Sequence, residues 1–478
     1  MRQTANRMTR SMTRNWQIAV ESLLAILLVG CTVGPNYKRP QVPVAPTFRG
    51  ADGADLSSAD AGSLGDQNWA AVFREPELQD LIRTALRNNY DVRIAAQRVL
   101  EQQAQVKITR AQQFPTLSVG GTGIGAELPD SLSSTIGSSI YAGSFNLSAA
   151  WTPDFWGLYR RQTEAARAQL LAQVWAQRAV RLTLVEQVAT AYIQLRALDR
   201  QLAIAQETVK TRQQSVELTR RLADGGSAPL SDLRQAEELE YTATSQIPQI
   251  EQQIQQQENA LRLLLGENPG PVAHTDESAL DPPPQDPPTG LPSRLLERRP
   301  DILQAEEQLV AANAQIGVAR AQFFPQLSIS ASGGVGGDQW SNLFDPAGHT
   351  IYGLGTLTQP LFEGGKLRGQ LQLSEHQKDE LVLNYQKTIA GAFRDTSNAL
   401  IALNKQHAAR EQQTMLVAAA QDATRLARTR YQGGATSYLE VLTTDSNLFS
   451  AQLNLVNAQE GEALSLVQLY GTLGGGWQ

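Results

Sequence analysis

The longest regular pattern of apolar and polar residues runs from about Leu158 to Leu222, a stretch without proline or glycine. Apolar residues recur there every seven positions, namely at Val188, Leu195, Leu202, Val209 and Val216. A heptad seam of this kind is typical of helices that pair side by side. The other positions are mostly Gln, Arg, Thr and Ala, which are too polar for a membrane span. The pattern therefore predicts a helix roughly 98 Å long that packs against neighbouring helices.

In four shorter stretches the hydrophobic period changes to two. Small or polar residues alternate with apolar ones over residues 116–125, 140–151, 326–335 and 350–359. Each stretch is about as long as a tilted transmembrane strand, roughly 9 to 11 residues. Alternation alone also fits an ordinary soluble sheet, because barrel strands give a weak signal one by one.

Aromatic residues at the helix-proximal ends of these stretches favour the membrane interpretation, because an interfacial girdle would lie there. The candidate interface aromatics are Phe114, Trp151, Phe155, Trp156, Phe324 and Phe362. A barrel in lipid must close, and bacterial barrels use at least eight strands. Four strands per chain cannot close a barrel, so the pattern predicts a barrel shared between the subunits of a homo-oligomer.

The chain repeats itself at an offset of about 210 residues, which indicates the duplication of one unit. The segment from Asp91 matches the segment from Asp301, and Gly225-Gly226 recurs as Gly433-Gly434. Each unit is predicted to contain, in order, a helix, two strands, a very long helix, a tight turn and a helix. In the first unit the shorter helices are expected at residues 91–113 and 229–265, with a kink or break at Pro248.

This pattern divides the chain into five segments. The expected segments are a signal peptide (1–30), a lipidated extended segment (31–67), a first repeat (68–266), a proline-rich equatorial linker (267–292) and a second repeat (293–478).

The N-terminus has the anatomy of a secretory signal. Four arginines precede an apolar run from Ser22 to Val29, which is too short to span a bilayer. The run ends in Leu-Val-Gly-Cys, which is similar to the bacterial lipobox, so Cys31 is predicted to carry a covalent lipid. Thr32 rather than Asp follows the cysteine, and the resemblance to bacterial lipoproteins implies passage to the outer membrane. The alternative is a signal peptide with an incidental cysteine.

Composition excludes several classes of function. The chain has 478 residues and one cysteine, so it cannot contain an internal disulfide. A net charge of -6 gives no reason to expect a nucleic-acid partner. The four histidines are far apart in the sequence, and neither a zinc-protease pair, a nucleophile elbow nor a phosphate-binding loop is present. The sequence therefore predicts no enzyme and no metal site.

Several motifs together resemble one family. The segment Cys31–Tyr37 (CTVGPNY) followed by Pro40, the motif Arg298–Asp301 (RRPD) and the C-terminal Leu473–Trp477 (LGGGW) are similar to those of outer-membrane efflux lipoproteins of the NodT subfamily, within the TolC-like outer-membrane factors. The resemblance implies an α+β membrane protein. Its homotrimer would form a 12-stranded transmembrane β-barrel, with four strands per chain, continuous with a long periplasmic α-helical barrel.

The same resemblance implies a function and partners. The chain is expected to be the outer-membrane channel of a tripartite efflux system, a passive exit duct served by a periplasmic adaptor and an inner-membrane pump, often of the proton-driven RND type. It would be anchored to the outer membrane by the lipid on Cys31, extend into the periplasm and need no other cofactor. The alternative is a non-porous periplasmic coiled-coil lipoprotein scaffold, because heptads alone do not require a hollow structure.

In the family, the glycine turns mark the periplasmic tips, where acidic and apolar side chains constrict the duct. The resemblance makes Asp224, Asp232, Leu222 and Leu426 the candidate gate residues. The second turn has no acid before Glu440. The alternative is that the two aspartates are ordinary solvated turn residues.

Overall fold

A computed structural model describes residues 32–44, 47–50, 63–127, 139–273, 290, 292–337 and 342–477. The predicted signal peptide, Cys31 and most of the predicted linker lie outside the described residues. The described chain forms two compact units. The first comprises the N-terminal segment up to Pro40 with residues 99–173 and 305–385, and the second comprises residues 41–98, 174–304 and 386–478.

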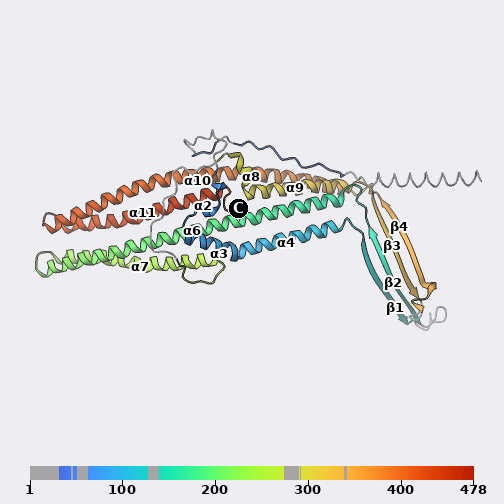
Figure 1. Ribbon diagram of the computed structural model, residues 1–478, viewed down its shortest axis with the longest axis horizontal. Coiled ribbons are helices and arrows are strands. Elements are labelled where there is room, and N and C mark those ends of the chain that lie inside the picture. The colour runs from blue at the N-terminus through green and yellow to red at the C-terminus, as the bar shows by residue number, and fades with distance from the viewer. Residues whose placement is uncertain are drawn as a thin grey trace, which may run out of the picture. The chain divides into compact units, whose positions relative to one another are not determined.

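The same series of elements occurs twice along the chain (Figure 1). The first series is α4 (Tyr90–Ala111), β1 (Thr116–Glu127), β2 (Ser139–Trp151), α6 (Leu158–Asp224) and α7 (Leu230–Leu264). The second is α9 (Pro300–Ala321), β3 (Gln326–Gly337), β4 (His349–Thr358), α10 (Lys366–Gln432) and α11 (Tyr438–Thr472). Corresponding helices have equal lengths of 22, 67 and 35 residues, which confirms the predicted order of elements in both halves.

Short helices precede each series. They are η1 (Leu64–Asp66), α2 (Trp69–Val72) and α3 (Pro76–Asn88) before the first, and η2 (Pro292–Arg294) and α8 (Leu295–Arg298) before the second, while η4 (Pro346–Gly348) lies between β3 and β4.

Local sequence explains where α4 and α9 begin. Asn89 precedes α4, and its Oδ1 accepts hydrogen bonds from the backbone N–H groups of Asp91 (2.8 Å) and Val92 (3.2 Å). These bonds satisfy donors that the first turn of a helix leaves unpaired. Pro300 occupies the first position of α9, where its fixed φ suits a helix and its missing N–H costs nothing.

The predicted break at Pro248 is wrong, because α7 continues through this proline. A proline inside a helix removes the hydrogen bond to the carbonyl four residues earlier, which here belongs to Thr244. Both Pro248 and Thr244 are exposed, so water can reach the freed carbonyl. The lost bond is therefore tolerated without ending the helix.

The four strands form one antiparallel sheet in the order β1-β2-β3-β4. The sheet has no crossover connection, and β1 and β4 are its two edges. Each strand is directly preceded or followed by one helix of the first unit: α4 leads into β1, β2 into α6, α9 into β3 and β4 into α10.

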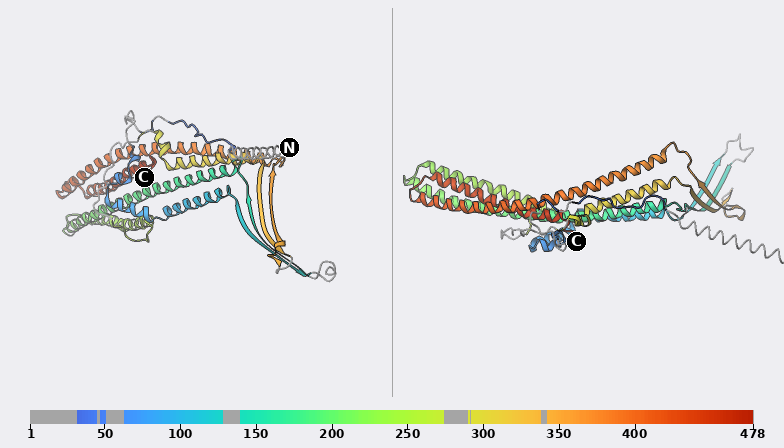
Figure 2. Two further views of the ribbon diagram at one scale, coloured as in Figure 1. Left: turned by 45° about the vertical axis from the view of Figure 1, so that its right-hand side comes forward. Right: turned by 90° about the horizontal axis from the view of Figure 1, so that it is seen from above.

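In the first unit these four helices follow the same order as the strands (Figure 1; Figure 2, left). Side-chain contacts join each helix to the next: Gln113 Nε2 donates to Thr163 Oγ1 (2.6 Å), the Arg161 side chain packs on Gly317, and Arg320 pairs with Glu375 (3.2 Å). The unit is therefore one layer of helices, α4-α6-α9-α10, that continues a sheet of the same order.

The second unit has the larger apolar core. Val188 and Leu195 of α6 are completely buried there, together with Leu261 of α7 and Leu469 of α11. Both α6 residues belong to the predicted heptad series. The seam of the long helix thus packs against partner helices, as its period requires.

Candidate functional site

The sheet has one apolar face and one polar face. Register pairs on the apolar face include Leu117 with Ala149, Val119 with Leu147 and Phe145 with Val335. Those on the polar face include Ser118 with Ser148, Thr122 with Ser144 and Ser332 with Ser148. Leu117 and Val119 are 73% and 77% exposed, so no described part of the chain covers the apolar face. A sheet of this kind separates lipid from water.

Both edges of the sheet are unpaired among the residues that the structure describes. β4 is exposed along its whole length, and its apolar side chains include Ile351 at 91% and Leu357 at 69% exposure. An open edge leaves backbone N–H and C=O groups without partners, which lipid does not tolerate. The edges therefore require strands from other copies of the chain.

The candidate interface aromatics lie at the helix-proximal strand ends, in two groups. Phe114, Trp151 and Phe362 are 54%, 39% and 90% exposed. Trp151 ends β2 and donates its Nε1–H to the backbone oxygen of Gln113 (3.1 Å). These three side chains are free to face an interface, as amphipathic aromatics do in membranes.

Trp156 and Phe324 pack on each other instead. Their rings stack with centroids 4.8 Å apart and an angle of 25°. The Trp156 Nε1–H donates to the backbone oxygen of Pro325 at 2.7 Å, so the polar edge of the indole is satisfied within the protein. Phe155 is half-buried beside them. This pair joins the start of α6 to the end of α9, a contact that sequence spacing did not indicate.

The N-terminal segment starts at the same level. Val33 donates its backbone N–H to the oxygen of Trp156 (3.0 Å), and Arg161 Nε donates to the oxygen of Val33 (3.2 Å). Gly34 lies directly against Gly317 of α9, where a Cβ on Gly34 would clash with the backbone of Gly317. Residue 33 is two positions after Cys31, so the described chain begins beside the strand ends.

Further along, the segment is fixed to α9 by an ion pair. Arg39 binds both carboxylate oxygens of Glu306, Nε to Oε1 at 2.7 Å, and Tyr37 donates to Oε1 at 3.3 Å. Burial, with the neighbouring Glu306 carboxylate, raises the pKa of the Tyr37 hydroxyl. Asn313 Nδ2 donates to the oxygen of Pro35 (2.9 Å). The segment therefore follows one face of α9.

The two glycine turns have the same geometry. Gly226 and Gly434 both adopt a φ of +72°, a left-handed conformation that side chains disfavour. Ser227 N–H donates to the oxygen of Leu222 (2.8 Å), and Ala435 N–H donates to that of Arg430 (2.9 Å). Each turn reverses the chain between a 67-residue and a 35-residue helix.

An apolar cluster brings the four helix ends near the turns together, with Val216 from α6, Leu233 from α7, Ala427 from α10 and Tyr438 from α11. We call this part of the second unit the tip.

The candidate gate residues occupy different environments at the tip. Asp224 ends α6 and is exposed, whereas Asp232 and Leu222 are half-buried and Leu426 is 52% exposed. Asp232 lies near Tyr431: burial first, and then the Asp232 carboxylate, raises the pKa of this tyrosine. Asp232 is therefore part of the packed tip, while Asp224 and Leu426 are exposed on its surface.

A buried charge network that sequence reasoning missed lies next to the tip. Asp445 of α11 binds Arg212 of α6 (Nε to Oδ2, 3.0 Å) and Arg428 of α10 (Nη2 to Oδ1, 2.6 Å). Arg212 also donates to the oxygen of Leu239 of α7 at 2.7 Å. Burial first, and then the Asp445 carboxylate, raises the pKa of Tyr438 to about 12. The only sequence signal was an acid within an otherwise apolar helix face.

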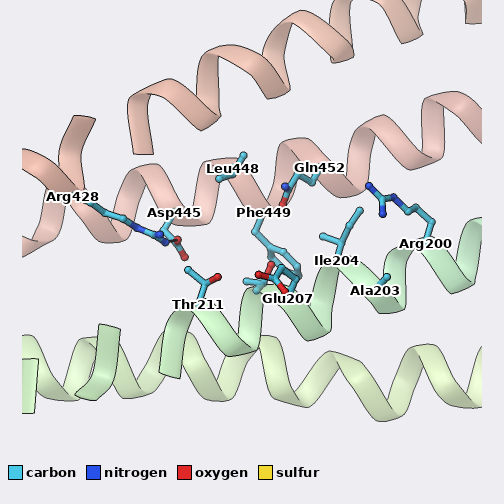
Figure 3. Close-up of a pocket in the computed structure, with 11 residues that line it drawn as sticks. Arg200, Ala203, Ile204, Glu207, Thr211, Arg428, Asp445, Leu448, Phe449 and Gln452 are labelled. Carbon is cyan, nitrogen blue, oxygen red and sulfur yellow. Dashed lines mark hydrogen bonds and ion pairs between the residues drawn. The ribbon is translucent and has the colours of Figure 1, made fainter. Parts of the chain in front are cut away.

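A pocket of about 240 Å³ adjoins this network (Figure 3). Charged side chains, Arg200, Glu207 and Arg428, line it together with apolar Ile204 and Phe449. At one end of the pocket, the Arg428 side chain points toward Asp445 and donates a hydrogen bond to its carboxylate. The mixture of charged and apolar residues defines no single ligand chemistry, and the pocket belongs to the packing between α6 and α11.

Among the described residues, no group of three or more His, Cys, Asp or Glu side chains could hold a metal ion.

No helix in the described ranges combines the length and the apolar character needed to cross a membrane.

A sheet with two unlike faces and two open edges, continued by long paired helices, defines a subunit of an oligomeric membrane channel. The chain belongs to the outer membrane efflux protein family, whose model matches residues 81–267 and 291–475. It is 37% identical over 466 residues to the toluene efflux pump outer membrane protein TtgC of Pseudomonas putida, covering 95% of each chain. It is 35% identical over 463 residues to the cation efflux system protein CusC of Escherichia coli O6:H1, covering 95% of this chain and 98% of CusC.

The fold agrees with a solved channel. The open-state MtrE outer membrane channel of Neisseria gonorrhoeae superposes with a TM-score of 0.84 at 29% identity, covering 94% of this chain and 99% of MtrE. These findings confirm the predicted trimeric fold class, the outer-membrane location and the role of an efflux channel component. The non-porous scaffold is thereby rejected.

Proposed function

We propose that three copies of the chain enclose a passive exit duct, through which substrates delivered by an inner-membrane pump and a periplasmic adaptor leave the cell, without catalysis by this protein. The observation that carries the proposal is the two-faced sheet with both edges open. Joining β4 of one copy to β1 of the next satisfies every edge and turns the serine- and threonine-rich face inward. The enclosed space is then lined by polar side chains and filled with water.

The proposal includes a lipid anchor on Cys31, which lies outside the described residues. Val33 is hydrogen-bonded to Trp156, at the strand ends where the membrane interface is expected. A lipid two residues before Val33 could therefore enter the bilayer without stretching the chain. The sheet itself would hold the assembly more firmly than the acyl chains.

We further propose that the tip is the constriction of the duct. Its helices are held together by the apolar cluster and by the Arg212–Asp445–Arg428 network. Asp224, Asp232, Leu222 and Leu426 remain the candidate gate residues. An adaptor that docks near the tip would open the duct by separating the two helical hairpins.

The cargo is proposed to be chosen by the pump. Relatives of similar identity are named for different cargo, toluene for TtgC at 37% and cations for CusC at 35%. Channels of the same family are thus named for chemically different cargo. A water-filled duct also lacks the enclosed, mostly apolar pocket that recognises a small molecule.

Two substitutions on the same edge strand test the duct. Val119 and Thr122 of β1 are both exposed, but the register places them on opposite faces of the sheet. A Val119→Arg change puts charge toward lipid, which costs about 2–4 kcal/mol per subunit at the bilayer centre and less at the level of Val119, which is closer to the interface. The Thr122→Arg change places the same charge in the wet interior.

The expected result is a low yield of membrane-inserted trimers for Val119→Arg, and normal yield with altered ion selectivity in planar bilayers for Thr122→Arg. Equal yields, or a purified wild-type trimer that never conducts even with the tip removed by proteolysis, would overturn the duct.

A further inference from the structure

A groove of about 630 Å³ in the first unit is lined by all four of its helices. Eight of its lining residues are glutamines, among them Gln105 of α4, Gln169 of α6, Gln315 of α9 and Gln377 of α10. We call it the glutamine groove. The groove lies on the concave face of this layer. Side chains of the first helix, α4, and the fourth helix, α10, can meet in one groove only on that face, because on the convex face they diverge.

The N-terminal segment lies on the opposite face of α9. Glu306, Asn313 and Gly317 contact this segment and, at about 100° per residue, they share one side of the helix. Gln308 and Gln315 line the groove and lie roughly 180° away from them. The layer therefore carries the N-terminal segment on one face of α9 and the glutamine groove on the opposite face.

The course of the N-terminal segment tells which face is inside. A segment that follows a lipidated Cys31 starts in the bilayer around the channel, so it descends along the outer surface. The groove then faces the lumen. This step rests on the exit duct and the lipid anchor proposed above.

We propose that the glutamine groove forms part of the lumen wall, and that its amide lining contributes no charge of its own to the passage of polar cargo. An amide side chain both donates and accepts hydrogen bonds and does not titrate. Among the described residues that line the groove, Glu380 alone is ionisable, so any charge selection at this level must come from its carboxylate. Further selection by charge would then have to occur at the tip or in the pump.

Thiol accessibility in intact cells tests the placement. The chain has one cysteine, Cys31, and its thiol is blocked if lipidated, so an introduced cysteine is the reactive one. Gln315 is exposed on the groove, and Lys38 is exposed on the N-terminal segment beside the Arg39–Glu306 pair. The variants Gln315→Cys and Lys38→Cys therefore probe opposite faces of α9.

The probe is a maleimide too large for general porins but narrower than the duct, with the unsubstituted protein as background. Gln315→Cys should react in intact cells, through the outer opening, and Lys38→Cys only after the outer membrane is permeabilised. Reaction of Gln315→Cys only after permeabilisation, or of Lys38→Cys in intact cells, would overturn the lumen placement.

The charge claim is tested on purified Gln315→Cys trimers with cationic and anionic maleimides of equal size. In trimers that also carry Glu380→Gln, which removes the one carboxylate of the described lining, the ratio of their rate constants, divided by the ratio for free cysteine, should stay within about threefold at low ionic strength. Adding Gln308→Glu to this variant, which gives three carboxylates per trimer, should move the ratio by more than this toward the cationic reagent. A larger ratio without Gln308→Glu overturns the claim, as does no movement with it.

Failure of this inference is distinguishable from failure of the duct. Trimers that form and conduct while the thiol results are reversed leave the duct intact and reject the lining. Loss of trimers or conduction in the unsubstituted protein would reject both.

Discussion

Arg212 and Asp445 form a buried ion pair, with Nε and Oδ2 3.0 Å apart, although 233 positions separate them in the sequence. Only 4% of the Arg212 side chain and 11% of the Asp445 side chain are exposed. Arg428 binds the second carboxylate oxygen, so one aspartate joins α6, α10 and α11 next to the tip. The two hairpins are therefore linked by charge as well as by apolar packing.

Replacing Asp445 by Asn should destabilise the protein strongly, because two arginines then lack their carboxylate and one of them is buried. Breaking a buried pair from one side costs about 3–5 kcal/mol. The control is Asp422→Asn, which breaks an exposed pair with Arg425 and should cost less than about 1 kcal/mol. Thermal unfolding of purified trimers measures both. Similar shifts for the two variants would mean that the Asp445 network contributes no more than a surface pair.

A charge at Trp156 should impair assembly more than one at Gln214. Trp156→Asp removes the ring stacked on Phe324 and the donor to Pro325, a loss of about 2–3 kcal/mol per subunit. Gln214 is exposed on α6, so Gln214→Asp should change little. Trp156→Phe keeps the stacking and loses only the hydrogen bond, which predicts an intermediate effect. The yield of trimers that resist detergent is the measurement, and equal yields for both aspartate variants would contradict the structural role of Trp156.

Glu186 predicts a dependence of stability on pH. Its carboxylate lies against Gly471, in the place that a Cβ would occupy, and burial raises its pKa from 4.5 to about 7, although Arg299 acts in the opposite direction. The folded state thus binds the proton more tightly than the unfolded state. This contribution is most favourable below about pH 4.5 and is lost as the pH rises to about 7.

The Glu186→Gln variant should not show this loss of stability with rising pH, because an amide does not titrate. Its unfolding temperature should match that of the wild type at pH 5 and exceed it at pH 8, by an amount equivalent to about 2–3 kcal/mol per subunit. Glu251→Gln, at an exposed position of α7, serves as the control. If the unfolding temperatures of the wild type and the variant differ by the same amount at both pH values, Glu186 is excluded as the titrating group.

Local patterns in the sequence predicted most of the fold. The period of two, the heptads and the glycine and proline positions are properties of short windows, and each of the four strands was predicted to within about two residues of its ends. The candidate interface aromatics lie near the strand ends, and their contact with a membrane interface stays a prediction. The duplication supplied the order of elements, because each half repeats the same series.

Contacts between distant residues could not be predicted in this way. Nothing in a window around Asp445 indicates that Arg212 will meet it, and the Trp156–Phe324 stack joins residues from different repeats. Pro248 misled the prediction because the cost of a helical proline depends on whether water reaches the freed carbonyl, which is a property of the packed structure. The side of α9 that faces the N-terminal segment likewise emerges only in three dimensions.

Cys31→Ser should abolish acyl labelling yet leave trimers in the membrane. Acyl chains contribute a limited anchoring energy, whereas the barrel strands of three subunits are embedded in the bilayer. Labelling with a radioactive or clickable fatty acid and the separation of membranes from soluble protein are the measurements. A soluble monomeric variant would contradict the membrane sheet, and retained labelling would contradict the lipid site.

The candidate gate contains two aspartates in each subunit. If Asp224 and Asp232 line the tip, three copies of each crowd around one axis in the trimer. Like charges held close together repel one another, and a ring of them attracts cations into a constriction. Replacing both by Ala should therefore reduce the preference for cations and change the closed-state conductance in planar bilayers.

The structure separates the two aspartates. Asp224 is exposed and should contribute mainly to selectivity, whereas Asp232 lies near Tyr431 and should also affect the packing of the tip. The single variants Asp224→Ala and Asp232→Ala distinguish these effects, with Asp422→Ala as an exposed control on α10. If the double variant matches the wild type in conductance and selectivity, the two acids are solvated turn residues. The constriction must then be formed by other side chains, of which Leu222 and Leu426 are the next to be replaced.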